Sequence, residues 1–183
     1  GDCFGGPSFY AATADIVVQV KGSVMAVTGA PVLEAATGEK VDPEDLGGWK
    51  LHSRKTGLVD LFAEDDQHCL TLVKKVLSYL PSNYQQLPPY VPPSDTNKER
   101  IPEIYDMVPT SPRRGYDMRR VLDTIFDEQS LLELKPHYDR SLITTFARLD
   151  GHVVGVIASN PMFNAGAMGW GACEKATSFI ALC

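Results

Sequence analysis

The sequence lacks the features that mark a membrane protein, a metal-binding module or a nucleic-acid-binding protein. No apolar run approaches the length that crosses a membrane. The four cysteines show neither a Cys-x-x-Cys spacing nor a Cys/His cluster at zinc spacing, so we expect reduced thiols and no metal site. The formal net charge is −6 and the basic pairs are dispersed, whereas phosphate neutralisation needs clustered Lys and Arg. We therefore expect neither a membrane nor a nucleic acid among the partners.

Motifs of familiar side-chain catalysis are also absent. Ser8 follows a glycine but lacks the closing glycine of a nucleophile elbow. The stretch 166–171 has its glycines in the wrong order for a dinucleotide fingerprint, and no phosphate-loop lysine follows it. The four histidines stand outside any recognised acid/base constellation, and they are His52, His68, His137 and His152. The residues alone predict neither a covalent serine mechanism nor a nucleotide loop.

The first 81 residues predict short alternating strands and helices. Residues 16–20 and 23–28 are apolar, β-branched runs typical of buried strands. A short helix is expected over 31–36. A longer amphipathic helix is expected over 65–80, with acidic residues in its first turn, lysines toward its end and a proline after it.

Residues 82–115 differ from the rest by their prolines. Seven of them punctuate the stretch, and they are Pro88, Pro89, Pro92, Pro93, Pro102, Pro109 and Pro112. Because proline removes a backbone donor and clashes inside a helix, this stretch is predicted to hold neither a helix nor a central strand. We interpret it as an extended connector anchored by its apolar residues.

Residues 116–183 predict a helix, a hairpin and a second helix. Asp117 is placed to cap a helix whose apolar residues, through Phe126, share one face. Asp150-Gly151 lies between the apolar runs 142–149 and 153–157, which is a strong hairpin signal. A final helix is expected over 172–182.

The segment Phe-Gly-Gly-Pro-Ser-Phe-Tyr at 4–10 could carry chemistry through its backbone. Glycines before a helix leave N–H groups open, with Gly6 expected as the N-cap and Pro7 at the first helical position. Such N–H groups can hold a developing oxyanion. Taken alone the segment is weak evidence, because most Gly-Gly turns before a helix are structural.

Residues 38–57 form the most specific stretch of the chain. Asp42 is placed to cap a short helix with Pro43 at its first position, and Gly47-Gly48 is expected to end it. The whole string, Gly-Glu-Lys-Val-Asp-Pro-Glu-Asp-Leu-Gly-Gly-Trp-Lys-Leu-His-Ser-Arg-Lys-Thr-Gly, closely resembles the carboxyltransferase subunit of biotin-dependent acyl-CoA carboxylases. That family includes propionyl-CoA and methylcrotonyl-CoA carboxylase.

The resemblance covers nearly the whole chain. It runs over 5–80, weakens across the connector and resumes at 116–119, with further characteristic stretches at 146–151 and 175–179. The family protein is longer and has two related crotonase-like halves. The resemblance implies an α/β fold of the crotonase type, built from β-β-α spiral units.

The same resemblance implies a domain organisation. Residues 1–81 would be the C-terminal part of the N-terminal carboxyltransferase domain, and 82–115 the proline-rich connector. Residues 116–183 would begin the C-terminal carboxyltransferase domain. We therefore expect a fragment of a longer protein that is inactive alone.

The function implied is carboxyl transfer from carboxybiotin to the α-carbon of an acyl-CoA. Biotin would be carried on a partner, either a biotin carboxyl carrier or a biotin carboxylase subunit, and acyl-CoA would be the substrate. The family's active site forms between the first half of one subunit and the second half of another, which implies a homo-oligomer. The expected location is the bacterial cytoplasm or the mitochondrial matrix.

Gly5 and Gly6 fall where this family has a Gly-Gly pair whose backbone amides stabilise the thioester enolate. Relatives often have a residue with an amide at the next position, whereas Pro7 has none. The resemblance therefore implies an oxyanion hole that uses the amides of Gly5 and Gly6. His52 and His68 are the two histidines inside the matched segment.

Two alternatives stay open. The α-type subunits of sodium-pumping decarboxylases resemble the same family and move the carboxyl group from acyl-CoA to biotin. A non-catalytic acyl-CoA-binding or assembly module is the other. Relatives commonly carry acidic residues where this chain has Gly169-Trp170-Gly171, and cues for the acyl chain point to both methylcrotonyl and propionyl types.

Overall fold

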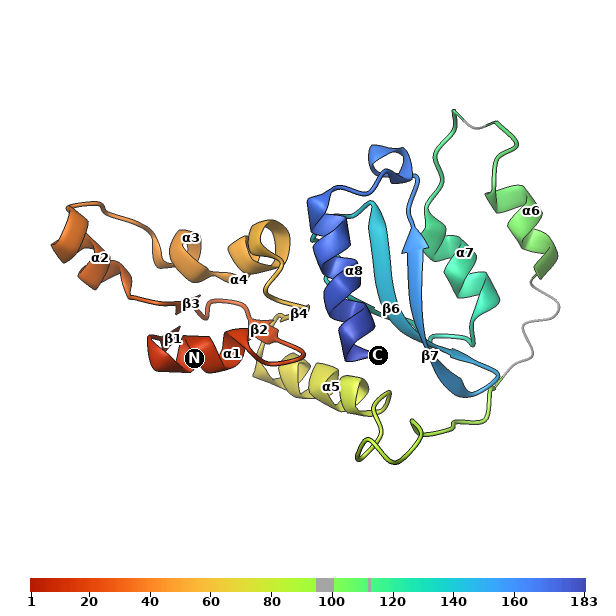
Figure 1. Cartoon of the computed structure of the whole chain (residues 1–183), viewed down its shortest axis with the longest axis horizontal. Coiled ribbons are helices and arrows are strands. Elements are labelled where there is room, and N and C mark those ends of the chain that lie inside the picture. Colours follow the sequence, from red (N-terminus) through yellow and green to blue (C-terminus); the bar gives the residue numbers. More distant parts are fainter. Residues whose placement is uncertain (95–100, 112) are drawn as a thin grey trace. The chain divides into compact units, whose positions relative to one another are not determined.

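The computed structural model describes residues 1–94, 101–111 and 113–183. The chain divides into two compact units, Gly1–Val73 and Lys74–Cys183, each a mixture of helices and strands (Figure 1). Among the described residues, no helix combines the length and apolar character needed to cross a membrane.

The first unit contains two pairs of short parallel strands. The pairs are β1 (Cys3–Phe4) with β3 (Met25–Ala26), and β2 (Val18–Val20) with β4 (Leu61–Ala63). The buried side chains of Val17, Met25 and Val59 form the core beneath them. Both predicted strands exist but are shorter than expected. Because β1 turns into a helix at Gly5, β3 has a partner strand for only two residues.

Five short helical segments complete this unit. They are α1 (Gly6–Ala12), α2 (Ala30–Thr37), α3 (Pro43–Gly47), α4 (Trp49–Leu51) and the π-helix η1 (His52–Thr56). The predicted cap of α3 is confirmed, since the Glu44 N–H donates to Asp42 Oδ1 at 2.8 Å. A Cβ at Gly47 would lie 2.3 Å from the Met25 carbonyl oxygen, so only glycine permits this close packing on β3.

Helix α5 (Asp66–Leu77) ends three residues before the predicted position. The chain leaves the helix at Ser78, and the side chain of Tyr79 is buried with its hydroxyl donating to the Ser130 carbonyl. The benefit of burying this aromatic ring outweighs one more helical turn. On the helix itself Val76 is buried, whereas Leu77 is 60% exposed.

The second unit is built on a three-stranded antiparallel sheet in the order β5-β6-β7. Its strands are β5 (Leu132–Leu134), β6 (Leu142–Leu149) and β7 (His152–Ser159). The predicted hairpin joins β6 to β7. Its two turn residues, Asp150 and Gly151, have φ of 51° and 79°, as a two-residue type I′ turn requires.

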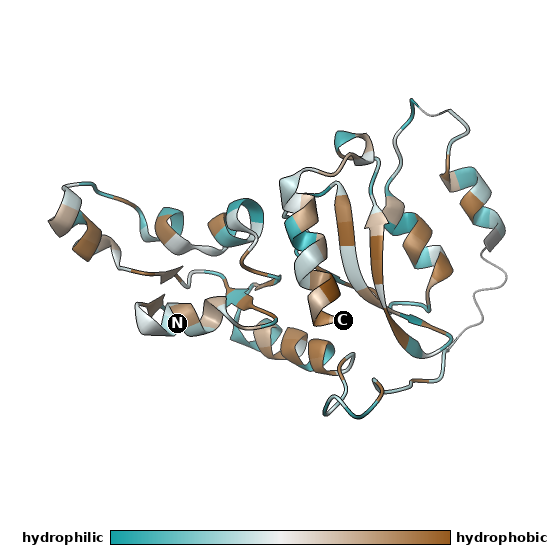
Figure 2. Cartoon of the chain, viewed as in Figure 1, coloured by the Kyte–Doolittle hydropathy of each residue, from teal (hydrophilic) through white to brown (hydrophobic). Residues whose placement is uncertain are grey.

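Helices α7 (Met118–Ile125) and α8 (Trp170–Leu182) cover opposite faces of this sheet (Figure 1). Leu122 of α7 packs in one cluster with Ile143 and Ala147 of β6. Phe146 points to the other face, where its ring lies 5.3 Å from that of Phe179 on α8. Both faces of β6 are therefore buried, and hydrophobic stretches run along β6 and β7 (Figure 2).

The prediction that the proline-rich connector holds no helix is wrong. It contains the 3₁₀ segment η3 (Ile101–Glu103) and the short helix α6 (Ile104–Met107). Pro102 lies at the start of this helical stretch, where its missing N–H is tolerated, and no proline follows until Pro109. One of the seven prolines on which this prediction rests, Pro112, lies outside the described residues. The domain limits at 81 and 116 stay predictions.

Candidate functional site

The Gly5-Gly6 turn joins β1 to helix α1. Gly5 has φ 66° and ψ −133°, a conformation that side chains with a Cβ avoid. Helix α1 begins at Gly6, so the N-cap is Gly5 and the expectation that Gly6 is the N-cap is wrong by one residue. Pro7 accordingly occupies the second helical position, where its missing N–H is tolerated.

The two glycine amides have different roles in this turn. The Gly5 N–H donates to the Val27 carbonyl at 3.0 Å and continues the pairing of β1 with β3. The Gly6 N–H makes no hydrogen bond to any described residue, and Gly6 is exposed. The pair therefore presents one open backbone donor, at Gly6.

Ser8 holds this turn in place. Its hydroxyl donates to the Gly5 carbonyl at 2.6 Å, its N–H donates to the same oxygen at 3.0 Å, and the residue is buried. Because the Ser8 hydroxyl donates its proton to a carbonyl, it does not donate to a catalytic base. The structure gives Ser8 a structural role and agrees with the absence of a nucleophile motif.

Space around the turn is open. A Cβ at Gly5 or Gly6 would meet no heavy atom within 4 Å. Glycine at position 5 is required by its positive φ, whereas position 6 tolerates a small side chain. Because Gly6 is exposed and its N–H donates to no described residue, this amide is available to a ligand oxygen.

His52 is a structural residue of the first unit. It is buried, with Nε2 at 2.7 Å from the Met25 carbonyl and Nδ1 at 3.0 Å from the Thr56 hydroxyl. Since a carbonyl only accepts, Nε2 carries a proton and donates to the Met25 carbonyl. Both ring nitrogens are occupied, so His52 ties the π-helix to β3 and has no nitrogen left for acid/base work.

His68 caps the start of α5. Its Nδ1 accepts from the Glu64 N–H at 3.2 Å, while its own N–H donates to Asp65 Oδ1 at 2.7 Å. These two bonds satisfy the N–H of Glu64, before the helix, and the N–H of His68, in its first turn. Neither histidine of the matched segment therefore belongs to an acid/base constellation.

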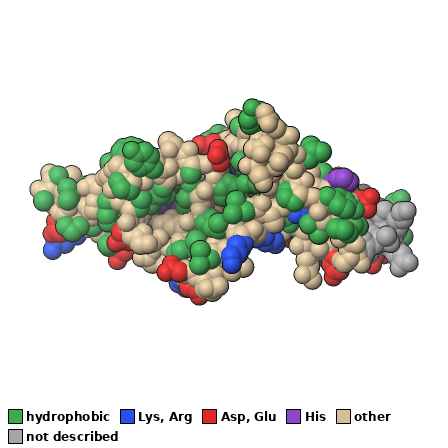
Figure 3. Space-filling model, turned by 90° about the horizontal axis from the view of Figure 1, so that it is seen from below, with side chains coloured by type: hydrophobic (Ala, Val, Ile, Leu, Met, Phe, Trp, Pro, Cys, Tyr) green, Lys and Arg blue, Asp and Glu red, His purple; other side chains and the backbone are tan. Residues whose placement is uncertain are grey.

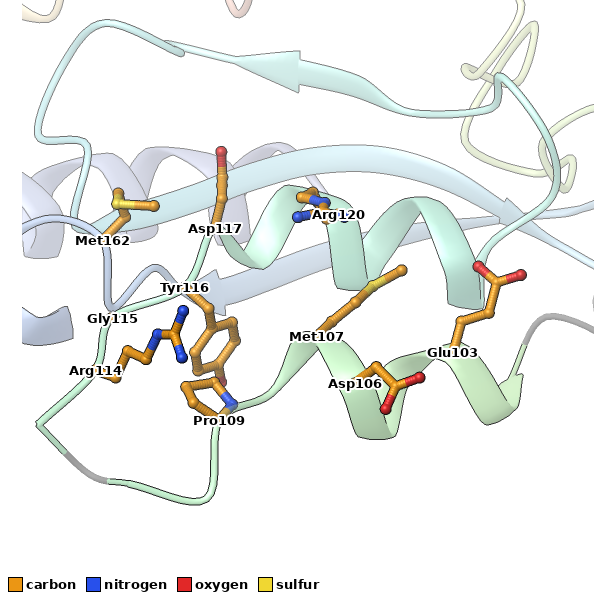
Figure 4. A pocket seen from close by; sticks show the side chains of 10 residues that line it. All are labelled: Glu103, Asp106, Met107, Pro109, Arg114, Gly115, Tyr116, Asp117, Arg120 and Met162. Atoms are coloured by element: carbon orange, nitrogen blue, oxygen red, sulfur yellow. The ribbon is translucent and has the colours of Figure 1, made fainter.

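A cavity of about 490 Å³ in the second unit lies between α6, residues 109 and 114–117, and α7 (Figure 4). Glu103 of η3 and Asp106 of α6 line it, and so do Arg114 and Arg120. Asp117 lines it as well, so three acidic side chains face two basic ones, and no described cluster of His, Cys, Asp or Glu could hold a metal ion.

The loop with Gly169-Trp170-Gly171 leads into α8. Trp170 is 74% exposed, and helix α8 has no acidic residue in its first turn. The Asp139 carboxylate compensates, since a Cβ at Gly171 would lie only 3.1 Å from its Oδ2. Nearby, burial and the 2.6 Å hydrogen bond to Glu174 raise the pKa of Tyr138 to about 12.

Lys175 of α8 is a fully buried cation that the sequence reasoning missed. Its ammonium donates to the carbonyls of Lys135, Tyr138 and Leu142 at 2.8, 3.2 and 2.8 Å. Burial lowers the pKa of Lys175 to about 8. The sequence signal for it was a single lysine inside the apolar helical pattern 172–182. In the structure, Lys175 fastens α8 to the turn before β6.

Comparison with known proteins identifies the family. The Carboxyl transferase domain family matches residues 1–183. The chain belongs to this family. The resemblance read from the sequence is thereby confirmed, and the mixed α/β architecture agrees with it.

Relatives in the carboxyl transferase family are similar at 34–36% identity over all of this chain. The 12S subunit of methylmalonyl-CoA carboxyltransferase from Propionibacterium freudenreichii subsp. shermanii is 36% identical, and the chain covers 35% of it. A propionyl-CoA carboxylase carboxyltransferase subunit from Haloferax mediterranei is 35% identical, with 36% covered. The alpha subunit of methylmalonyl-CoA decarboxylase from Propionigenium modestum is 34% identical, with 36% covered. The chain thus spans about a third of the length of these relatives.

The fold agrees with solved structures of the family. Crystal structures of transcarboxylase 12S match all of this chain and 36% of theirs, at 36% identity and TM-scores of 0.94 and 0.95. A single-chain, multi-domain long-chain acyl-CoA carboxylase matches at 30% identity and TM-score 0.81, with 18% of its chain covered.

Proposed function

We propose that this chain is part of the carboxyltransferase component of a biotin-dependent acyl-CoA carboxylase or transcarboxylase. The observation that carries the proposal is the match over all 183 residues, in sequence and in fold, to transcarboxylase 12S. The relatives named above act by name on propionyl-CoA or methylmalonyl-CoA. We accordingly propose a short acyl thioester of the propionyl type as the substrate.

In the proposed reaction, this chain contributes a backbone donor rather than a side-chain acid or base. Transfer of the α-proton to the biotin, once it has given up its carboxyl group, would turn the thioester carbonyl into an enolate, whose oxygen gains negative charge. The open Gly6 N–H is suited to this oxygen, because a fixed donor that needs no reorganisation stabilises developing charge strongly. Gly5 completes the proposed oxyanion hole through its left-handed turn and its bond to Val27.

Carboxybiotin, delivered by a partner protein, supplies the carboxyl group. No described residue is assigned to biotin, and the cofactor would carry the difficult chemistry. We further propose a homo-oligomer, in line with the hexamer assembly named for transcarboxylase 12S. Sedimentation of the full-length protein tests that assembly directly.

The amide of Gly6 is tested by two substitutions in the full-length protein. Gly6→Ala keeps the N–H and meets open space, so we expect turnover within about threefold of wild type. Gly6→Pro removes the donor and also restricts the backbone at Gly5, and we expect a loss in kcat of roughly a hundredfold or more, at least the typical cost of one oxyanion-hole donor. Equal activity of the two variants, both folded by circular dichroism, would show that this amide is not part of the site.

The overall function is tested with the full-length protein, its biotinylated partner and a panel of acyl-CoAs. Carboxylation of propionyl-CoA above acetyl-CoA and methylcrotonyl-CoA is the expected result. Because a decarboxylase alpha subunit is as similar as the carboxylases, the opposite direction is a second candidate. CO2 release from methylmalonyl-CoA without carboxylation of any thioester would select the decarboxylase.

A further inference from the structure

Basic side chains are dispersed over most of the chain. On the face of the described residues seen in Figure 3, Lys and Arg lie in small groups separated by other side chains. One cavity of about 880 Å³ in the first unit differs, because four of its lining side chains are basic, namely Lys21, Lys50, Arg54 and Lys55. We call it the Trp49 pocket, after the indole on its wall. Its residues come from the turn after β2, from α3 and α4, and from the π-helix η1.

The indole of Trp49 organises two of these cations. Its ring is stacked on Phe62 at 3.9 Å, which fixes the ring's position. Arg54 Cζ lies 5.6 Å and Lys50 Nζ 6.0 Å from the ring centroid, within the range of cation–π attraction. Since Phe62 and two cations already engage the ring, its role is to hold head groups at the cavity rather than to stack on a ligand.

The Trp49 pocket has more basic side chains than carboxylates paired with them. Lys21 pairs with Glu64 at 3.1 Å. Among the described residues, Lys50, Arg54 and Lys55 have no carboxylate within ion-pair distance.

Two acidic residues also line the pocket, Glu44 and Asp45. Glu44 turns toward the backbone, since a Cβ at Gly48 would lie 2.4 Å from its Oε2. Asp45 is exposed in the first turn of α3, where the helix dipole favours it. The pocket is therefore a local reversal of the chain's net charge of −6.

The backbone beneath these cations is unusual. Arg54 and Lys55 lie on a π-helix, a geometry that is rare and concentrated at functional sites. Ser53 of the same π-helix is 4% exposed, and its hydroxyl makes no hydrogen bond among the described residues. Buried polar groups are normally paired, so this segment departs from ordinary packing in two ways.

We propose that the Trp49 pocket binds the phosphate groups of a ligand carrying at least two negative charges. The planar guanidinium of Arg54 suits bidentate contact with phosphate oxygens, and Lys50 and Lys55 add two point charges at the same cavity. The phosphates belong either to the acyl-CoA substrate, which would rest on the proposed function, or to a free phosphate compound acting as an effector.

The site is tested by calorimetric titration of the full-length protein with inorganic pyrophosphate. We expect Arg54→Gln to raise the dissociation constant about ten- to a hundredfold, because one charge-assisted bidentate contact is lost. Lys55→Gln, at an exposed position, serves as a second variant if Arg54→Gln does not fold. Affinity should also fall with added salt.

Lys40→Gln is the matched control. It removes the same charge from an exposed lysine of the first unit that pairs with Glu34 and does not line the pocket. Pyrophosphate affinity should be unchanged in this control. No binding by wild type at millimolar pyrophosphate, or equal affinity in wild type and Lys55→Gln, would overturn the proposal.

Steady-state kinetics separates the two sources. If the phosphates are those of the substrate, Arg54→Gln raises KM for the acyl-CoA with kcat retained, and coenzyme A displaces pyrophosphate. If they belong to an effector, KM stays constant while pyrophosphate affinity falls. Absence of turnover on every thioester would count against the proposed function alone, because the calorimetric result does not depend on it.

Discussion

Arg148 makes three backbone contacts whose removal gives a quantitative test of the second unit. Its side chain is 8% exposed and donates to the carbonyls of Pro89 and Ser78, each at 2.7 Å. A third, longer bond reaches the Gly151 carbonyl at 3.3 Å, and the guanidinium lies 5.0 Å from the Tyr79 ring. One cation thus joins the end of α5, the connector and the hairpin turn.

The cost of Arg148→Met follows from these contacts. The Gly151 carbonyl also accepts from the Val91 N–H, so the substitution leaves two carbonyls without a donor, those of Ser78 and Pro89. Ser78 and Pro89 are exposed residues, so water can reach their carbonyls, and each lost bond costs about 1 kcal/mol; the lost cation–π contact adds about 1 kcal/mol. Relief of the buried charge offsets part of this. We expect a net loss of roughly 2 kcal/mol in the free energy of unfolding.

Two assays on the full-length protein check this expectation. Denaturant unfolding should show the loss of stability, and chymotrypsin should cut faster after Tyr90, because the connector loses its anchor on the hairpin. Arg113→Met, at an exposed position, is the control and should change neither. A stability loss below about 1 kcal/mol with unchanged cleavage would refute the role assigned to Arg148.

Two further predictions concern the second unit. Between pH 8 and 10.5 the unfolded chain keeps a proton that folded Lys175 has released, so wild type should gain roughly 3 kcal/mol of stability relative to Lys175→Met as pH rises through that window. Paired pH-dependent unfolding curves measure this, and a flat difference would mean that the three carbonyls hold the lysine charged. Gly151→Ala should cost more than 2 kcal/mol, because φ is 79° and the new Cβ would lie 2.3 Å from the Val91 carbonyl oxygen. Thermal unfolding beside Gly38→Ala, which has a similar φ of 77° but open space, separates the clash from the backbone strain.

Local elements were predictable because their causes lie within a few residues. The cap of α3 needs only Asp42 and the amide two residues later, and the hairpin needs only Asp150-Gly151 between two apolar runs. The family was also predictable, because residues 38–57 form one long uninterrupted stretch that resembles it. The end of α5 was not, since it depends on the burial of Tyr79 against Ser130, 51 residues away.

For the candidate site, the sequence predicted the position of the residues but not the roles of their amides. The sequence placed Gly5 and Gly6 before a helix, but it could not distinguish their amides, because Val27 takes the Gly5 N–H only once β1 and β3 pair. Histidines that looked available, such as His52, proved to be occupied by backbone partners.

By itself, then, the sequence determined the family, the caps at Asp42 and Asp117, the hairpin and the position of the glycine turn, since each depends on neighbours along the chain. Only the tertiary structure decided which amide stays open, why Arg148 and Lys175 are buried, and how Lys21 meets the cations of residues 50–55. Those outcomes depend on atoms brought together from positions tens of residues apart, and no local pattern records such distances.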